Sequence, residues 1–164
     1  MSKKIQKTNA ARLLDRAGIP YNLIPYPVDE DHLDAQHVAD ALGEDIACVF
    51  KTLVLEGSGV GHFVCVIPGA HEVDLKKAAR VAGAKKADLI PMKELLSLTG
   101  YIRGGCSPIG MKKPFPIFFH KTATEFDRIF VSAGQRGLQF EIAPAQLIEY
   151  VGGTLADITK DTEE

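Results

Sequence analysis

The chain has 164 residues, 46% of them hydrophobic and 24% charged, with a formal net charge of −2. That length is enough for one domain with a sizeable core, and that charge gives no global attraction to nucleic acid. No apolar run approaches the roughly 20 residues that a membrane-spanning helix needs, so we expect a cytoplasmic location without membrane contact. We expect residues 1–164 to form a single domain.

Apolar periodicity and chain breakers predict the helices and strands. Most expected helices end at a glycine, and most expected strands are short apolar runs bounded by glycine or proline. In chain order the expected elements are helix 10–17, strand 21–26, helix 35–42, strands 49–55 and 62–67, helices 75–82 and 92–98, strands 116–120, 128–132 and 138–142, and helix 145–151.

The order of these elements indicates the fold class. Strands 49–55 and 62–67 are joined by a connection short enough for a hairpin, as are strands 128–132 and 138–142. Hairpins interrupted by helices are typical of a mixed α/β or α+β sheet rather than a regular doubly wound one. We therefore expect a mixed sheet flanked by helices, without a linker or an internal repeat.

The strand at 49–55 carries one charged residue, Lys51, among mostly apolar neighbours. An ammonium group is costly to bury alone, so it must reach water, lose its proton or find an anion. One interpretation is a lysine whose stem packs while its head extends to solvent at the end of the strand. The other is a pocket cation that binds an anionic or carbonyl-bearing ligand.

The segment 100–110, GYIRGGCSPIG, is the densest irregular stretch of the chain. Its glycines at 104, 105 and 110 let the backbone approach a ligand closely and direct N–H groups toward it. Such donors suit a phosphate or a developing oxyanion, although the segment lacks the spacing and the Lys-Ser/Thr ending of a P-loop. The simpler interpretation is a turn that joins a helix to a strand.

Candidate nucleophiles are few. Ser132 stands at a strand end before Gly134, where its hydroxyl could bind a ligand or cap the turn, and no histidine lies near it in sequence. Cys106 has no evident base beside it, and we expect it to be a bystander. The histidines are scattered and the three cysteines lack metal-ligand spacing, so we expect no metal and no cofactor.

Basic residues gather in the second half of the chain, near the glycine-rich turns. A solvated surface is the usual reason for such charges, and a phosphate-binding footprint of moderate strength is the alternative. The residues are Arg103, Lys112, Lys113, Lys121, Arg128 and Arg136.

Three segments, in this order, resemble the YbaK/EbsC family, and most closely its bacterial Cys-tRNA(Pro)/Cys-tRNA(Cys) deacylases. They are Phe50-Lys51-Thr52-Leu53, the segment 100–110 quoted above, and Ser132-Ala133-Gly134-Gln135-Arg136-Gly137-Leu138. The resemblance covers nearly the whole chain. It implies an α/β domain with a barrel-like mixed sheet, related to the editing domain inserted in bacterial prolyl-tRNA synthetases.

The resemblance also implies trans-editing, which is hydrolysis of the ester in mischarged Cys-tRNA(Pro), and possible action on Cys-tRNA(Cys). In the family's proposed chemistry the cysteinyl thiol attacks its own ester carbonyl and leaves as a thiolactone. The protein then has to orient the thiol and stabilise the oxyanion. That chemistry needs neither a catalytic triad nor a metal.

The family's functional residues fall on the same segments. Lys51 is the key residue that the resemblance implies, holding the aminoacyl-adenosine end. The resemblance implies mischarged tRNA and prolyl-tRNA synthetase as partners, and one departure from the family is the lack of an aromatic residue around Asp34. The expected substrate-binding residues are Tyr26, Thr52, Gly104, Gly105, Ser132 and Gly134.

Three alternatives stay open at this point. The same chemistry could clear another mischarged species, such as Ala-tRNA(Pro). The chain could instead be a non-catalytic module that binds tRNA or a synthetase. A third possibility is an enzyme that forms a Schiff base on Lys51, whose pKa would be lowered by burial.

Overall fold

The structure is a computed structural model that describes residues 6–161, and the elements below lie within that range. The helices are α1 (Asn9–Ala17), α2 (Ala35–Leu42), α3 (Leu75–Ala82), α4 (Leu95–Thr99) and α5 (Pro144–Val151). The strands are β1 (Tyr21–Pro25), β2 (Phe50–Gly57), β3 (Gly61–Pro68), β4 (Ala87–Leu89), β5 (Ile117–His120), β6 (Ile129–Ser132), β7 (Leu138–Ile142) and β8 (Thr154–Ala156). Short 3₁₀ turns occupy Ile46–Cys48, Met92–Glu94 and Lys121–Glu125.

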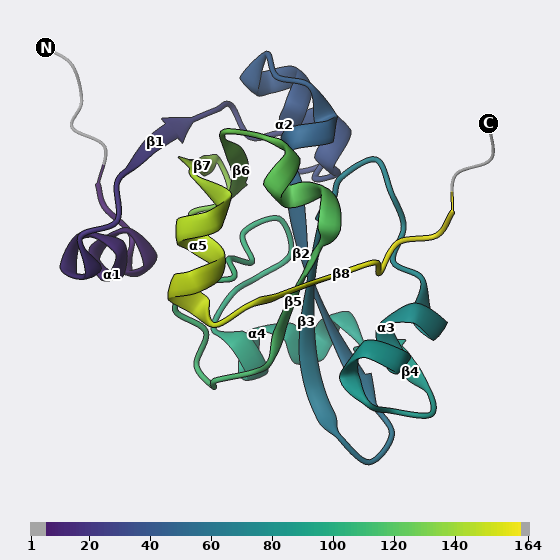
Figure 1. Cartoon of the computed structure of the whole chain (residues 1–164). Coiled ribbons are helices and arrows are strands. Elements are labelled where there is room, and N and C mark those ends of the chain that lie inside the picture. The colour runs from purple at the N-terminus through teal and green to yellow at the C-terminus, as the bar shows by residue number, and fades with distance from the viewer. Residues whose placement is uncertain (1–5, 162–164) are drawn as a thin grey trace, which may run out of the picture.

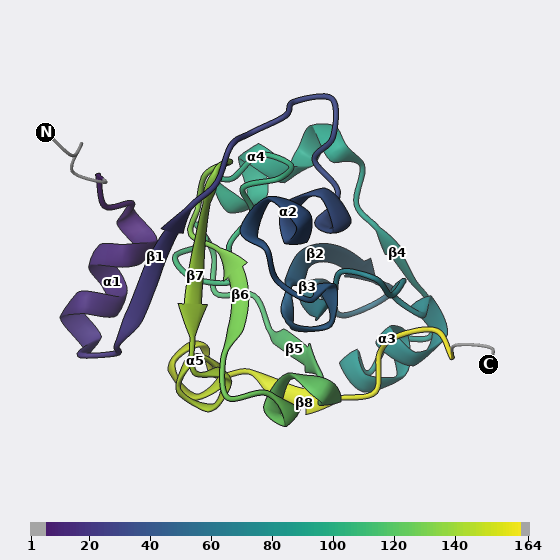
Figure 2. The same ribbon diagram turned by 90° about the horizontal axis from the view of Figure 1, so that it is seen from above.

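The strands form two sheets. One has the order β1-β7-β6 and is antiparallel, and the other has the order β4-β2-β3-β5-β8 and is mixed, with parallel pairs β3–β5 and β5–β8. Figures 1 and 2 show the three-stranded sheet, α1 and α5 on one side of the long β2–β3 hairpin, with α3 on the other. A parallel bridge between Val49 and Phe130 connects the two sheets just before β2.

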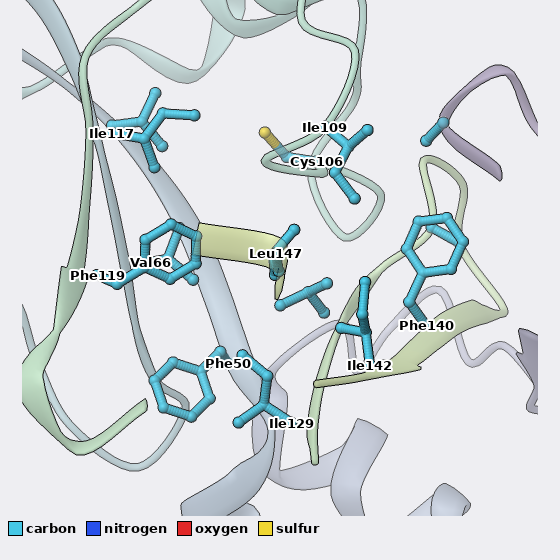
Figure 3. Close-up of a cluster of buried hydrophobic side chains, with 14 of the residues drawn as sticks. Phe50, Val66, Cys106, Ile109, Ile117, Phe119, Ile129, Phe140, Ile142 and Leu147 are labelled. Carbon is cyan, nitrogen blue, oxygen red and sulfur yellow. The ribbon is translucent and has the colours of Figure 1, made fainter. Parts of the chain in front are cut away.

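The largest apolar core fills the space between the two sheets. Phe50 of β2, Phe119 of β5 and Phe140 of β7 all belong to it, and Figure 3 shows Leu147 of α5 between Phe140 on one side and Phe50 and Phe119 on the other. Leu14 of α1 joins the same core and is fully buried. Burial of one such side chain stabilises the fold by about 1.5–3 kcal/mol. This core therefore fixes where the start of β2 stands relative to the end of β6.

Helix α3 covers the opposite face of the five-stranded sheet. Ala78 and Ala79 belong to a second apolar cluster there, together with Phe63 of β3. The helix begins where the Asp74 carboxylate accepts a hydrogen bond from the Lys77 N–H at 3.0 Å, as expected for an acidic N-cap. With both faces covered, the β2–β3 hairpin is a rigid support for residues at its open end.

The expected fold class, an α/β domain with a mixed sheet flanked by helices, is confirmed. The strands form two sheets rather than one closed barrel, because β1, β6 and β7 pair among themselves. β4 and β8 have no counterpart among the expected elements, since three residues carry too little periodicity to be recognised. Within residues 6–161, no helix has both the length and the apolar character needed to cross a membrane.

Candidate functional site

A cavity of about 760 Å³ lies beside the first half of β2. Its wall comes from segments far apart in the chain: the turn before α2, the residues after β3 and β4, the glycine-rich segment 100–110, and the facing ends of β6 and β7. This volume is within the range of pockets that hold small ligands. Lys51, Thr52, Gly104 and Ser132 all line it, so the structure brings these four expected site residues together.

The cavity occupies an unpaired part of the β2 edge. β4 pairs only with Leu55–Gly57, and the bridge at Val49 lies beyond the other end of the open stretch. On this edge the Ile90 N–H donates a hydrogen bond to the Val54 carbonyl at 3.2 Å. Because residues two apart direct their peptide groups to the same edge of a strand, the peptide group of Thr52 faces the cavity. A backbone N–H donor is therefore available in the wall.

Lys51 is half-buried in the cavity wall, and its Nζ donates a hydrogen bond to the Gly69 carbonyl at 3.2 Å. Burial lowers the pKa of Lys51, and the nearby charge of Glu72 opposes that shift. Glu72 is itself paired with Lys160 at 2.9 Å, and among the described residues Lys51 forms no ion pair. This environment favours the interpretation of Lys51 as a pocket cation over a head group extended into water.

Gly69 holds the Lys51 amine in place, and the sequence predictions contain no such role for it. Its carbonyl accepts the Lys51 hydrogen bond, while its N–H donates to the Val49 carbonyl at 2.8 Å. A side chain on Gly69 would overlap the Cβ atom of Ala35, the first residue of α2. The sequence signal for this tight turn is Pro68-Gly69 directly after an apolar run.

The glycine-rich segment packs against the β6–β7 turn. A Cβ atom on Gly105 would lie 3.0 Å from the Cα atom of Gln135, so backbone meets backbone there. Gly104 has φ +85°, and a Cβ atom on it would lie 3.4 Å from the Nε of Arg136. The close approach of the two backbones therefore favours glycine at 105, and the positive φ favours glycine at 104. Gly104 lies in the cavity wall and Gly105 outside it.

Ser132 lies in the cavity wall at the end of β6, where its Oγ accepts a hydrogen bond from the Gly134 N–H at 3.2 Å. The hydroxyl oxygen thus caps the turn, and the hydroxyl hydrogen can be donated to a ligand. Gly134 packs on the Tyr101 ring rather than lining the cavity. Tyr26 donates its N–H to the Gly137 carbonyl at 2.9 Å and also lies outside the wall. Substrate contacts by Tyr26 and Gly134 stay predictions.

Two buried polar atoms in the wall, Thr52 Oγ1 and Gln139 Oε1, have no hydrogen-bond partner among the described residues. Gln139 is 5% exposed and lies opposite Ser132 in the β6–β7 pairing. Leaving a buried polar atom without a partner costs about 1–3 kcal/mol. A ligand that satisfies these atoms would recover that cost. Gln139 is not among the site residues expected from the sequence, although a polar residue between Leu138 and Phe140 in an apolar strand is a usable signal.

Among the described residues, the cavity wall contains no activated nucleophile. It has no histidine, and Asp34 is its one carboxylate. Cys106 lines the wall, but burial raises the pKa of its thiol to about 12. A thiol with that pKa stays protonated at neutral pH and does not act as a thiolate. Within residues 6–161, no three histidine, cysteine or acidic residues are grouped so as to hold a metal ion.

Comparison with known families and proteins gives three matches that bear on this site. The model of the family described as "Aminoacyl-tRNA editing domain" matches residues 29–150. An Enterococcus faecalis protein named "Putative Cys-tRNA(Pro)/Cys-tRNA(Cys) deacylase EbsC" is 47% identical over 157 residues, which cover 96% of each chain. A proline–tRNA ligase of Cupriavidus necator is 24% identical over 139 residues, covering 83% of this chain and 24% of the ligase.

A solved structure shares the fold. It is that of "a putative trans-editing enzyme for prolyl tRNA synthetase", with a TM-score of 0.82 and 24% identity. The superposition covers 95% of this chain and 100% of the other. At this level of identity the likeness concerns the fold alone.

Proposed function

The chain belongs to the aminoacyl-tRNA editing domain family, and from this premise we propose that it hydrolyses the ester of mischarged Cys-tRNA(Pro), with Cys-tRNA(Cys) as a second candidate substrate. The name of the 47% identical relative supports the substrate, and the cavity supports the chemistry. The observation that carries the proposal is a half-buried lysine in a cavity wall that, among residues 6–161, contains no activated nucleophile. The domain in this proposal comprises residues 1–164.

The need for such an enzyme follows from the size of the two amino acids. Cysteine and proline are close in volume, so one binding pocket separates them poorly and a second, hydrolytic site is required. A free-standing domain that meets the charged tRNA after synthesis supplies that second site. This is trans-editing.

Each polar group of the cavity has a part in the proposed complex. The Lys51 ammonium, held by Gly69, binds the aminoacyl-adenosine end by charge and hydrogen bonding. The Thr52 N–H donates to the ester oxygen on which negative charge develops. The buried oxygens of Thr52 and Gln139 accept hydrogen bonds from the substrate's amino group, which satisfies both.

The proposed reaction uses the substrate's own thiol. The cysteinyl sulfur attacks the ester carbonyl, a carbon–sulfur bond forms, and the bond to the ribose oxygen breaks. The thiol proton ends on that ribose oxygen, and the amino acid leaves as a thiolactone that water opens. The protein contributes orientation and charge stabilisation, which together account for large rate effects without a protein nucleophile.

As part of the proposal, the protein works in the cytoplasm and meets its substrate on a complex of tRNA and prolyl-tRNA synthetase. A net charge of −2 gives little attraction to RNA, so a shared complex would raise the effective concentration of the tRNA end. The match to a proline–tRNA ligase supports this partner. Co-sedimentation of the three components tests it, and the absence of a ternary complex would contradict it.

Deacylation of Cys-tRNA(Pro), Ala-tRNA(Pro) and Pro-tRNA(Pro) by the purified protein tests the function. We expect amino-acid release from the cysteine ester alone. Release of alanine would assign the site to a different mischarged species, and release from none of the three would indicate a binding module. Borohydride trapping addresses the remaining alternative, because a covalent adduct on Lys51 would indicate Schiff-base chemistry.

Cys106→Ser is expected to release cysteine at a rate within about threefold of the wild type, a difference of less than about 0.7 kcal/mol in the barrier. The physical reason is that the protonated Cys106 thiol takes no part in the chemistry. The rate is measured on Cys-tRNA(Pro) under single-turnover conditions, with Cys65→Ser as a control for loss of another buried thiol. If Cys106→Ser is inactive but its stability is unchanged, the Cys106 thiol takes part in the reaction.

A further inference from the structure

Two arginines stand together beside the cavity, one on the glycine-rich segment and one on the β6–β7 turn. Arg103 lines the cavity wall, and the Nε of Arg136 donates a hydrogen bond to the Arg103 carbonyl at 2.8 Å. Arg136 is half-buried and lies against Gly104. Because the two loops pack backbone to backbone, both arginines are carried by a rigid support.

Among the described residues, neither arginine has a carboxylate partner. The ion pairs there involve lysines and histidines, and none involves Asp34, the acid in the cavity wall. The hydrogen bond of Arg136 uses Nε, which leaves both terminal nitrogens to donate outward. Arginine stays charged and donates paired hydrogen bonds that match the spacing of phosphate oxygens.

The other basic residues of the second half are placed differently. Lys121 lies 3.8 Å from the Asp157 carboxylate, and the side chain of Lys112 runs past Gly100. Arg128 is exposed and directly precedes β6, at the opposite end of that strand from Ser132. None of these three lines the cavity, and neither does Lys113. Of the basic footprint expected from the sequence, Arg103 therefore lies in the cavity wall itself, and Arg136 adjoins it through the hydrogen bond to the Arg103 carbonyl.

We infer that Arg103 and Arg136 bind the phosphodiester that precedes the terminal adenosine of the tRNA. The inference rests on the proposed function, since it takes the aminoacyl-adenosine to fill the cavity. The first phosphate of the strand then lies at the cavity mouth, within reach of the two loops. Contacts to phosphate set register without reading sequence, so this site accepts any tRNA whose end enters the cavity.

Three cysteinyl esters test the inference: cysteinyl-adenosine, cysteinyl-CpA, and cysteinyl-CpA with a neutral methylphosphonate linkage. For Arg103→Ala we expect the KM for cysteinyl-CpA to rise about tenfold with kcat unchanged, as for loss of one charge-assisted contact. The two esters without a charged phosphate should show no change. Arg136→Gln should behave in the same way, and Arg128→Ala, which removes an exposed arginine away from the cavity, should resemble the wild type on all three.

An equal loss by Arg103→Ala on all three esters would overturn the inference, because it would indicate a structural role. No loss on cysteinyl-CpA would overturn it as well. If the wild type hydrolyses none of the esters, the proposed function fails. Calorimetric titration with CpA that carries no amino acid still decides the phosphate site. We expect CpA to bind Arg103→Ala about tenfold more weakly than the wild type, and equal affinity would contradict the assignment.

Discussion

Replacing Lys51 with alanine is expected to slow cysteine release from Cys-tRNA(Pro) at least about tenfold, which corresponds to about 1.4 kcal/mol of lost transition-state stabilisation. The reason is that Lys51 is the one lysine in the cavity wall of the described chain, and its amine is already oriented by the Gly69 carbonyl. Charge-assisted hydrogen bonds of this kind are stronger than neutral ones. Single-turnover release of labelled cysteine gives the rate.

The fold of Lys51→Ala is expected to be intact. Burial lowers the pKa of Lys51 below its unfolded value, so below that lowered pKa the charged amine opposes folding rather than favouring it. Lys76→Ala, at an exposed position on α3, is the matched control and should keep full activity. If Lys51→Ala releases cysteine at the wild-type rate, Lys51 has no part in the mechanism.

The same pKa shift predicts a pH dependence of the wild type. The active form carries the ammonium, so the enzyme-dependent rate should fall as pH rises through the Lys51 pKa. Burial places that fall below the ordinary lysine value of about 10.4. Lys51→Arg keeps its charge throughout this range, and whatever activity it retains should not show the fall.

Replacing Gly69 with alanine is expected to have the second-largest effect, with cysteine release reduced about tenfold and unfolding free energy lowered by about 1–3 kcal/mol. The new Cβ atom would overlap that of Ala35 and lie 3.1 Å from the Val49 carbonyl. Either α2 or the turn must therefore move. A shifted turn takes away the carbonyl that orients Lys51. Denaturant unfolding and single-turnover release measure the two effects.

A second substitution, at Ala35, distinguishes steric overlap from other causes of lost activity in Gly69→Ala. In Ala35→Gly/Gly69→Ala the overlapping Cβ atom of α2 is absent, so activity should return most of the way to the wild-type value. Gly69 does not have a positive φ, so alanine at this position brings no backbone strain of its own. Full activity of Gly69→Ala alone would show that the turn does not position Lys51.

Local signals were sufficient for most elements of the fold. The helix at 35–42 and the hairpin of β2 and β3 follow from an apolar stripe ended by Gly43 and from two apolar runs joined by glycines. The arrangement of strands in two sheets was beyond these signals. It depends on the pairing of β1 with β7, which are more than a hundred residues apart in sequence.

The candidate site was predictable where its residues form short motifs. Lys51 and Ser132 stand out in sequence because a charge and a hydroxyl lie in apolar strands, and Gly104 stands out because it belongs to a glycine-rich segment. Gly69 and Gln139 do not, since each acts through one backbone or side-chain oxygen whose surroundings come from another part of the fold. The open edge of β2 likewise depends on how short β4 is, which no local pattern reports.

The most direct measurement compares the wild type on tRNA(Pro) charged with cysteine and on tRNA(Pro) charged with serine. The two esters differ by one atom, so binding in the cavity is nearly the same and only the internal nucleophile changes. If the substrate thiol is the nucleophile and Lys51 binds the aminoacyl-adenosine end, the serine ester should be cleaved at least about tenfold more slowly, because a hydroxyl is a far weaker nucleophile than a thiol. Equal rates would contradict this, and would mean that the protein or an activated water attacks the ester.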